Sequence, residues 1–128
     1  TDLITIVALE HGKKIGRTLG FPTANLKIFN KIYPPRGIYG VEVLIEGETK
    51  LRDGLLNIGF NPTIPNEFPK LSVEVYILDF DQDIYGKELL VKIKKYTRPE
   101  VKCNSLEELK ELIHNDVVSW RRHLGEIK

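Results

Sequence analysis

Strand-like segments follow one another along most of this chain, with no helical segment between them. Each is short and rich in β-branched or apolar residues, and turn-forming residues such as Gly, Pro and Asp stand between them. The five clearest segments are residues 3–9, 38–46, 49–58, 71–78 and 88–96. Parallel strands need long crossover connections, so this spacing predicts an antiparallel sheet of five or six strands. Such a sheet is expected to close into a small barrel.

Residues 71–78 show the strand pattern most clearly, because their side chains alternate with a period of two. One predicted face carries Leu71, Val73, Val75 and Ile77, and the other carries Ser72, Glu74, Tyr76 and Leu78.

The C-terminal part changes to a helical period. Ser105 and Glu108 have the spacing of a capping box, and Gly125 stands where a helix would stop. Between them, apolar residues recur every three or four positions and form one stripe. They are Leu106, Leu109, Leu112, Ile113, Val117, Trp120 and Leu124. The sequence therefore predicts one long terminal helix that covers the barrel.

Length and composition limit the class of protein. The 128 residues suit one domain, residues 1–128. The formal net charge of +1 lacks the basic excess of a dedicated nucleic-acid binder. Cys103 is the single cysteine, which excludes an internal disulfide and favours a reducing, cytoplasmic location. The chain shows no signal-peptide pattern and no apolar run long enough to span a bilayer. Residue 1 is Thr and Met is absent, which leaves open whether a longer protein contains this domain.

A glycine-rich basic loop precedes the second strand-like segment. Its residues are Gly12, Gly16 and Gly20, with Lys13, Lys14 and Arg17 among them. Glycines let backbone N–H groups approach an anion, and basic side chains add charge, so the loop suits phosphate. The spacing does not match a P-loop, because three residues rather than four separate the first two glycines, and Arg17-Thr18 stands where Lys-Ser/Thr is required. A flexible surface loop is the alternative interpretation.

The stretch Pro22-Thr23-Ala24-Asn25 favours the phosphate interpretation. In an extended chain Thr23 and Asn25 point to the same side. A hydroxyl and an amide carbonyl are oxygen donors suited to Mg²⁺. Pro22 restrains the backbone that holds them. The alternative is an ordinary turn in which the Asn side chain caps a neighbour.

The motif Gly-x-x-x-Gly-Arg-x-x-Gly-Phe-Pro-Thr-Ala-Asn, residues 12–25, resembles the signature of riboflavin kinases. Further stretches resemble that family in the same order, namely residues 37–40, 57–63, 73–80, 84–86, 98–100 and 105–116. The resemblance implies a mainly β fold, a six-stranded antiparallel Greek-key β-barrel with a long C-terminal α-helix. It also implies Mg²⁺-dependent transfer of the γ-phosphate of ATP to the 5′-hydroxyl of riboflavin, giving FMN and ADP.

The resemblance implies site residues at matching positions. Glu74 corresponds to the catalytic carboxylate, which would orient or accept the proton of the riboflavin hydroxyl. The metal positions are Thr23 and Asn25. The ATP-binding positions are Gly12, Arg17, Gly20, Thr23, Asn25, Ile77, Asp79 and Tyr85. The flavin-binding positions are Arg98, Val101 and Cys103.

The chain departs from the family pattern at two positions. Val7 replaces a usual glycine, and Cys103 replaces a usual aromatic residue. In many bacteria this domain is joined to an FMN adenylyltransferase domain, which makes FAD. The chain has no His-x-Gly-His motif, so that second step is not expected of it.

Three other interpretations compete with the kinase. Asp79, Asp81 and Asp83 begin like a calcium loop, but Ile84 stands where that loop needs glycine. A non-catalytic flavin- or RNA-binding barrel would make Glu74 dispensable. A flavin-dependent reductase would bind FMN as a cofactor instead of making it.

Overall fold

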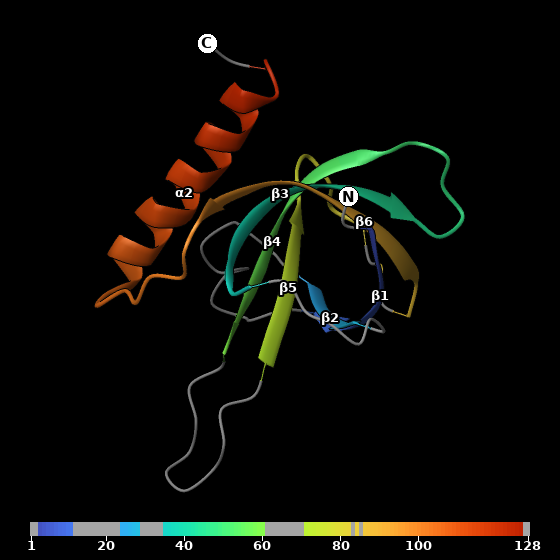
Figure 1. Cartoon of the computed structure of the whole chain (residues 1–128), viewed down its shortest axis with the longest axis horizontal. Coiled ribbons are helices and arrows are strands. Elements are labelled where there is room, and N and C mark those ends of the chain that lie inside the picture. Colours follow the sequence, from blue (N-terminus) through green and yellow to red (C-terminus); the bar gives the residue numbers. More distant parts are fainter. Residues whose placement is uncertain are drawn as a thin grey trace, which may run out of the picture.

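The computed structural model describes residues 3–11, 24–28, 35–60, 71–82, 84 and 86–126. Within them it contains six strands and one long helix, which lies outside the sheet (Figure 1). The strands are β1 (Leu3–His11), β2 (Ala24–Ile28), β3 (Gly37–Ile45), β4 (Arg52–Phe60), β5 (Leu71–Ile77) and β6 (Glu88–Arg98). The helix is α2 (Leu106–His123). The prediction of a mainly β domain with a C-terminal helix is confirmed.

All neighbouring strands pair antiparallel, in the order β1-β2-β5-β4-β3-β6. β1 also pairs with β6, so the ring of strands closes. β2 lies between the predicted strand-like segments 3–9 and 38–46, just after the glycine-rich loop, and is not among the five clearest segments. Its pairing with β5 is short and joins Ala24 to Val75 and Asn25 to Glu74.

The inside of the ring is filled by one apolar cluster. β5 contributes Val73, Val75 and Ile77, three residues that the sequence predicted to share one face, and that face points inward. The other buried members are Tyr39, Val41, Val43, Ile45, Leu56, Ile58, Ile84, Leu89 and Val91. Burial of so many branched side chains is the main stabilising contribution to the fold.

A second apolar cluster attaches α2 to the outside of β3, β4 and β5. Val117 and Trp120 of the helix pack with Ile38, Leu55 and Leu78. Only these two residues of the predicted stripe are buried, and Leu106 at the helix start is 55% exposed. The C-terminal half of α2 therefore anchors the helix, while its N-terminal half leaves apolar surface uncovered.

The ends of α2 follow the predicted capping pattern. The Ser105 Oγ accepts a hydrogen bond from the Glu108 backbone N–H at 3.1 Å. Gly125 has φ +83°, a conformation that glycine adopts without strain, and its N–H donates to the Arg122 carbonyl. No helix in the part of the chain that the structure describes is long and apolar enough to cross a membrane.

The β3–β4 connection is longer than the sequence predicted. Gly47 has φ +87° and lies in the expected turn. However, β4 begins at Arg52 and not near residue 49. The Arg52 Nε lies 2.9 Å from the Glu48 Oε1, an ion pair that spans the connection. Residues 49–51 are therefore part of the turn region and not of the sheet.

Candidate active site

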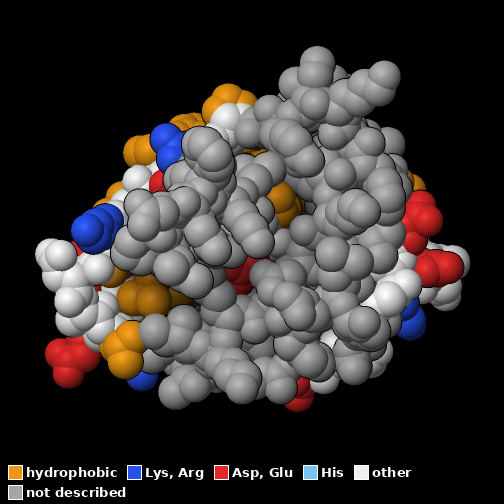
Figure 2. All heavy atoms as spheres, turned by 90° about the horizontal axis from the view of Figure 1, so that it is seen from below, with side chains coloured by type: hydrophobic (Ala, Val, Ile, Leu, Met, Phe, Trp, Pro, Cys, Tyr) orange, Lys and Arg blue, Asp and Glu red, His pale blue; other side chains and the backbone are white. Residues whose placement is uncertain are grey.

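Glu74 is a carboxylate buried in the middle of β5, with only 5% of its surface exposed. It is the one buried charged residue among those the structure describes. The Ser72 hydroxyl donates to its Oε1 at 3.3 Å. Both residues lie on the outer face of the strand, because Val73 and Val75 point inward. Figure 2 shows Asp or Glu side-chain atoms below the surrounding surface, near the middle of one face of the molecule, with hydrophobic side chains near them.

Two asparagines flank Glu74 across the sheet. In the pairing register, position 74 lies opposite Asn25 of β2 on one side and Asn57 of β4 on the other. Directly paired residues of antiparallel strands have Cβ atoms roughly 5 Å apart. The Asn57 Oδ1 is buried and has no hydrogen-bond partner among the residues that the structure describes. A buried acceptor without a donor is costly, so this oxygen marks a place where a ligand donor would be favourable.

Several predicted site residues lie outside the described residues, namely Gly12, Arg17, Gly20, Thr23 and Tyr85. Their placement stays a prediction. Of the predicted metal pair, Asn25 is described through its backbone, and the structure brings it next to Glu74.

The predicted nucleotide residues after Glu74 lie apart from its side chain. Ile77 is buried in the core inside the ring, on the opposite face of β5. Asp79 lies in the turn after β5 with φ +53°, and Arg121 of α2 binds both its carboxylate oxygens at 2.8 and 3.0 Å. This hydrogen bonding lowers the pKa of Asp79 and raises that of Arg121. Both assignments to ATP remain predictions.

Two further groups, Tyr76 and Asp53, lie near the C-terminal end of α2 and have shifted pKa values. Burial raises the pKa of Tyr76, which packs against the outer apolar cluster. Burial also raises the pKa of Asp53, and the negative charges of Glu126 and Glu42 add to the effect. Asp53 lies four residues before Asn57 on β4. Burial is therefore the main cause of both pKa shifts, and Glu74 does not contribute to them.

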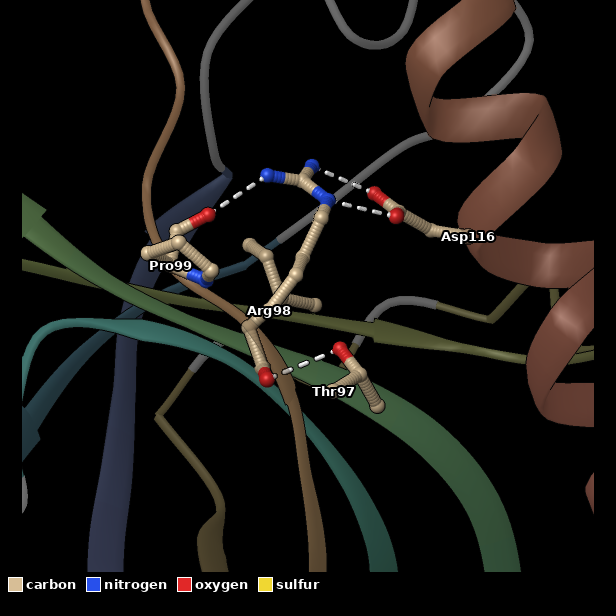
Figure 3. Close-up of polar contacts among 5 residues, drawn as sticks. Thr97, Arg98, Pro99 and Asp116 are labelled. Atoms are coloured by element: carbon tan, nitrogen blue, oxygen red, sulfur yellow. Dashed lines mark hydrogen bonds and ion pairs between the residues drawn. The ribbon is translucent and has the colours of Figure 1, made fainter.

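The predicted flavin-binding residues lie on the connection between β6 and α2. Arg98 ends β6, and Asp116 of α2 holds its guanidinium through two bonds, from Nε at 2.7 Å and from Nη2 at 2.6 Å (Figure 3). The Nη1 of Arg98 donates to the Pro99 carbonyl at 2.9 Å. Val101 is 50% exposed and Cys103 is partly buried. The connection is thus fixed at its start by an ion pair and presents an apolar side chain to solvent.

Glu100, on the same connection, approaches the outer face of β4. A Cβ atom added to Gly59 would overlap the Glu100 carboxyl group. Gly59 lies opposite Ser72 in the register, so Glu100 lies on the same face as Glu74. Asn57, Gly59 and Glu100 are not among the site residues predicted from the sequence. The resembling stretches contain all three, but only the strand register shows that they lie near Glu74.

Among the side chains that the structure describes, Ser72 and Asn57 lie beside Glu74 and offer oxygen atoms, not the imidazole or thiolate ligands that zinc prefers. No group of three or more His, Cys, Asp or Glu residues is placed to hold a metal in the described part of the chain. Mg²⁺ is commonly held by one or two protein oxygens together with substrate phosphates. The carboxylate of Glu74, with Asn25 opposite it in the strand register, fits that mode of binding.

Comparison with known proteins identifies the family. The family model described as riboflavin kinase matches residues 6–124. A bifunctional riboflavin kinase/FMN adenylyltransferase of Listeria monocytogenes is 42% identical over 120 residues, and the corresponding Bacillus subtilis protein is 39% identical. Each match covers 92% of this chain but only 37% of the relative.

Two solved structures have a similar fold, and one of them is a riboflavin kinase. A riboflavin kinase from Trypanosoma brucei superimposes with a TM-score of 0.62 at 26% identity, covering 96% of this chain and 80% of the other. A Streptococcus pneumoniae structure named as a macrolide-efflux protein gives 0.80 at 32% identity, covering 93% of this chain and 38% of the other. The family match and the curated relatives together show that this chain belongs to the riboflavin kinase (flavokinase) family.

Proposed function

We propose that the domain transfers the γ-phosphate of ATP to the 5′-hydroxyl of riboflavin, giving FMN and ADP. Family membership supports the reaction. The observation that carries the proposal is the register that sets the buried Glu74 directly beside Asn25. Phosphoryl transfer needs an acceptor hydroxyl and a charge-neutralised phosphate held side by side, and this pairing supplies a carboxylate next to an oxygen ligand.

Glu74 is the proposed catalytic residue. Its carboxylate orients the riboflavin hydroxyl and accepts its proton as the phosphate is transferred. The Ser72 hydroxyl bonded to Oε1 restrains the carboxylate in one position. Burial at 5% exposure limits competing contacts with water.

Nucleotide binding is proposed for the β2 side of Glu74. Asn25 and Thr23 would hold Mg²⁺, which when bound neutralises charge on the phosphates. The backbone of the loop around Gly12 and Gly20, with Arg17, would bind the same phosphates. Ile77, Asp79 and Tyr85 are proposed for the nucleotide pocket.

Flavin binding is proposed for the connection between β6 and α2. Val101 and the 55%-exposed Leu106 offer apolar surface suited to the flavin ring system. Cys103 would lie at the edge of this surface. Arg98 is bonded to Asp116 and Pro99, so we assign it to fixing the connection as well as to flavin contact.

At a finer level, we propose that the closed ring of strands is the six-stranded Greek-key barrel of this family, and that residues 1–128 form one domain. The chain spans 37% of the length of its bifunctional relatives, so a covalently linked FMN adenylyltransferase domain is proposed as its partner. Balanced charge supports small-molecule substrates and not nucleic acid. We also propose a cytoplasmic location.

One assay tests the activity. The purified chain is incubated with riboflavin and Mg·ATP, and FMN and ADP are separated and quantified. We expect equal amounts of the two products and none without Mg²⁺. Riboflavin binding without FMN formation would instead indicate a non-catalytic flavin-binding domain. Failure to form FMN, while FMN itself binds tightly, would point to a flavin-dependent reductase.

A further inference from the structure

Hydrogen-bond acceptors form a row on the outer face of β4 and β5, starting at Glu74. The Asn57 side chain comes next, directly opposite Glu74, and within the described ranges its buried Oδ1 has no hydrogen-bond partner. Glu100 follows, because its carboxyl group lies against Gly59, two residues further along β4. Two residues of strand correspond to about 7 Å, so the row extends away from Glu74 by roughly that distance.

The position of Glu100 is built into the fold. Gly59 has no Cβ, and any larger residue would displace the carboxyl group from β4. Two residues before Glu100, the guanidinium of Arg98 is bonded to Asp116 of α2 and to the Pro99 carbonyl. Figure 3 shows this guanidinium between the helix and the start of the connection. Within the described part of the chain, the Glu100 carboxylate itself has no hydrogen bond or ion pair.

A row of acceptors selects a ligand rich in O–H donors. Carboxylates and an amide oxygen would repel phosphate, so this side of Glu74 is unsuited to the triphosphate. The same groups accept hydrogen bonds from several hydroxyls of a polyol chain, and bonds to a charged acceptor are the stronger kind. A buried acceptor that lacks its donor also disfavours an analogue without hydroxyls.

We propose that Glu100, with Asn57, binds the ribityl hydroxyls of riboflavin and makes the site specific for the polyol chain. This inference rests on the proposed kinase function and adds residues that determine acceptor specificity. Glu74 then lies between two different environments. The phosphates approach from the β2 side at Asn25, and the polyol lies along β4 towards Gly59.

Binding of two flavins tests the proposal. Riboflavin and lumiflavin share one ring system, but lumiflavin has a methyl group where riboflavin has the ribityl chain. Dissociation constants are measured from flavin fluorescence for the wild type, Glu100→Ala and Gly59→Ala. We expect each variant to weaken riboflavin binding about tenfold and to leave lumiflavin binding unchanged. Glu111→Ala, an exposed helix position, is the matched control and should change neither.

The outcomes separate this proposal from the kinase assignment. If Glu100→Ala weakens the binding of both flavins equally, or weakens the binding of neither, the proposed contact with the polyol chain is overturned. If Gly59→Ala folds poorly, Asn57→Leu supplies the second variant and should show the same selectivity. FMN formation by the wild type is measured separately, and its absence would overturn the kinase function whatever the binding results.

Discussion

Asn25 and Glu74 are direct partners across β2 and β5, although the two residues lie far apart in the sequence. The pairing between these strands is short, since Ala24 with Val75 is the other pair in its register. The proposed metal position and the proposed catalytic carboxylate thus lie where β2 pairs with β5, which is the shortest strand pairing among the described residues. Their separation is set by backbone hydrogen bonding, which fixes positions more tightly than surface side chains would.

Glu74→Gln should abolish most turnover without unfolding the protein. Glutamine has nearly the same shape and can still bond to Ser72, but it cannot accept the hydroxyl proton. We expect kcat to fall roughly 10²–10⁴-fold, as for loss of a general base. Riboflavin affinity should change little. Steady-state rates of FMN formation, with thermal unfolding of both proteins, measure the two effects.

Glu111→Gln provides the matched control for that substitution, because Glu111 is exposed on α2. It should leave both kcat and stability unchanged. Normal turnover in Glu74→Gln would refute the catalytic assignment, and equal losses in the two variants would show that the effect is not specific to the site.

Asp116→Asn should loosen the connection that carries the proposed flavin residues. The carboxylate accepts two short bonds from Arg98, and both side chains are largely buried, at 12% and 21% exposure. Loss of the charge should lower the free energy of unfolding by about 1–3 kcal/mol. It should also raise the KM for riboflavin more than the KM for ATP. Urea denaturation and initial rates at varied riboflavin test both effects.

Asn115→Ser is the control for Asp116→Asn, since Asn115 is the exposed neighbour on the same helix. Arg98→Lys should resemble Asp116→Asn, because lysine keeps the charge but cannot form the two parallel bonds. An unchanged KM for riboflavin in both site variants would contradict the positioning role of the ion pair.

Asp79→Asn should remove a pH-dependent part of the stability. Arg121 lowers the pKa of Asp79 in the folded state, so the ionised carboxylate favours folding. This contribution is complete above the unfolded pKa of about 3.9 and is lost as the pH falls through the lower folded value. The wild type should therefore be more stable than the variant at neutral pH, and the difference should vanish in acid. Asparagine tolerates the positive φ of this position, so backbone strain does not confuse the comparison.

Urea unfolding of both proteins, measured at about five pH values between roughly 2.5 and 7, gives this difference in stability. Asp81→Asn is the control, because Asp81 is exposed in the same acidic stretch and has no ion pair within the described residues. Since 77% of the Asp79 side chain is exposed, solvent should keep the effect small. A stability difference that persists unchanged in acid would argue against the Arg121 bond as its cause.

Local sequence patterns predicted most of the fold, because alternation and helical period are properties of neighbouring residues. The faces of β5, the Ser105 cap and the Gly125 stop all follow from such patterns. β2 was harder to predict, because it lies among glycines and prolines and pairs with β5 over a short stretch.

The surroundings of Glu74 depend on contacts between distant segments, which local patterns do not contain. That Asn57 lies opposite Glu74 follows from the β4–β5 register. That Glu100 reaches Gly59 follows from the path of the connection after β6. Ile77 is another example. It is close to Glu74 in the sequence, but its side chain lies on the opposite face of β5, in the core.

The packing of α2 on the outside of the sheet gives the last prediction, at Gly40. A Cβ atom at this position would lie 2.5 Å from three ring carbons of Trp120, which is 2% exposed and cannot move freely. Gly40→Ala should therefore lower the free energy of unfolding by about 1–3 kcal/mol, as overpacking does. Gly59→Ala is the matched control, because its added Cβ would meet only the flexible end of Glu100. Thermal and urea unfolding of both variants should show a clear loss at position 40 and almost none at position 59, and equal stabilities would mean that α2 is not fixed through Trp120.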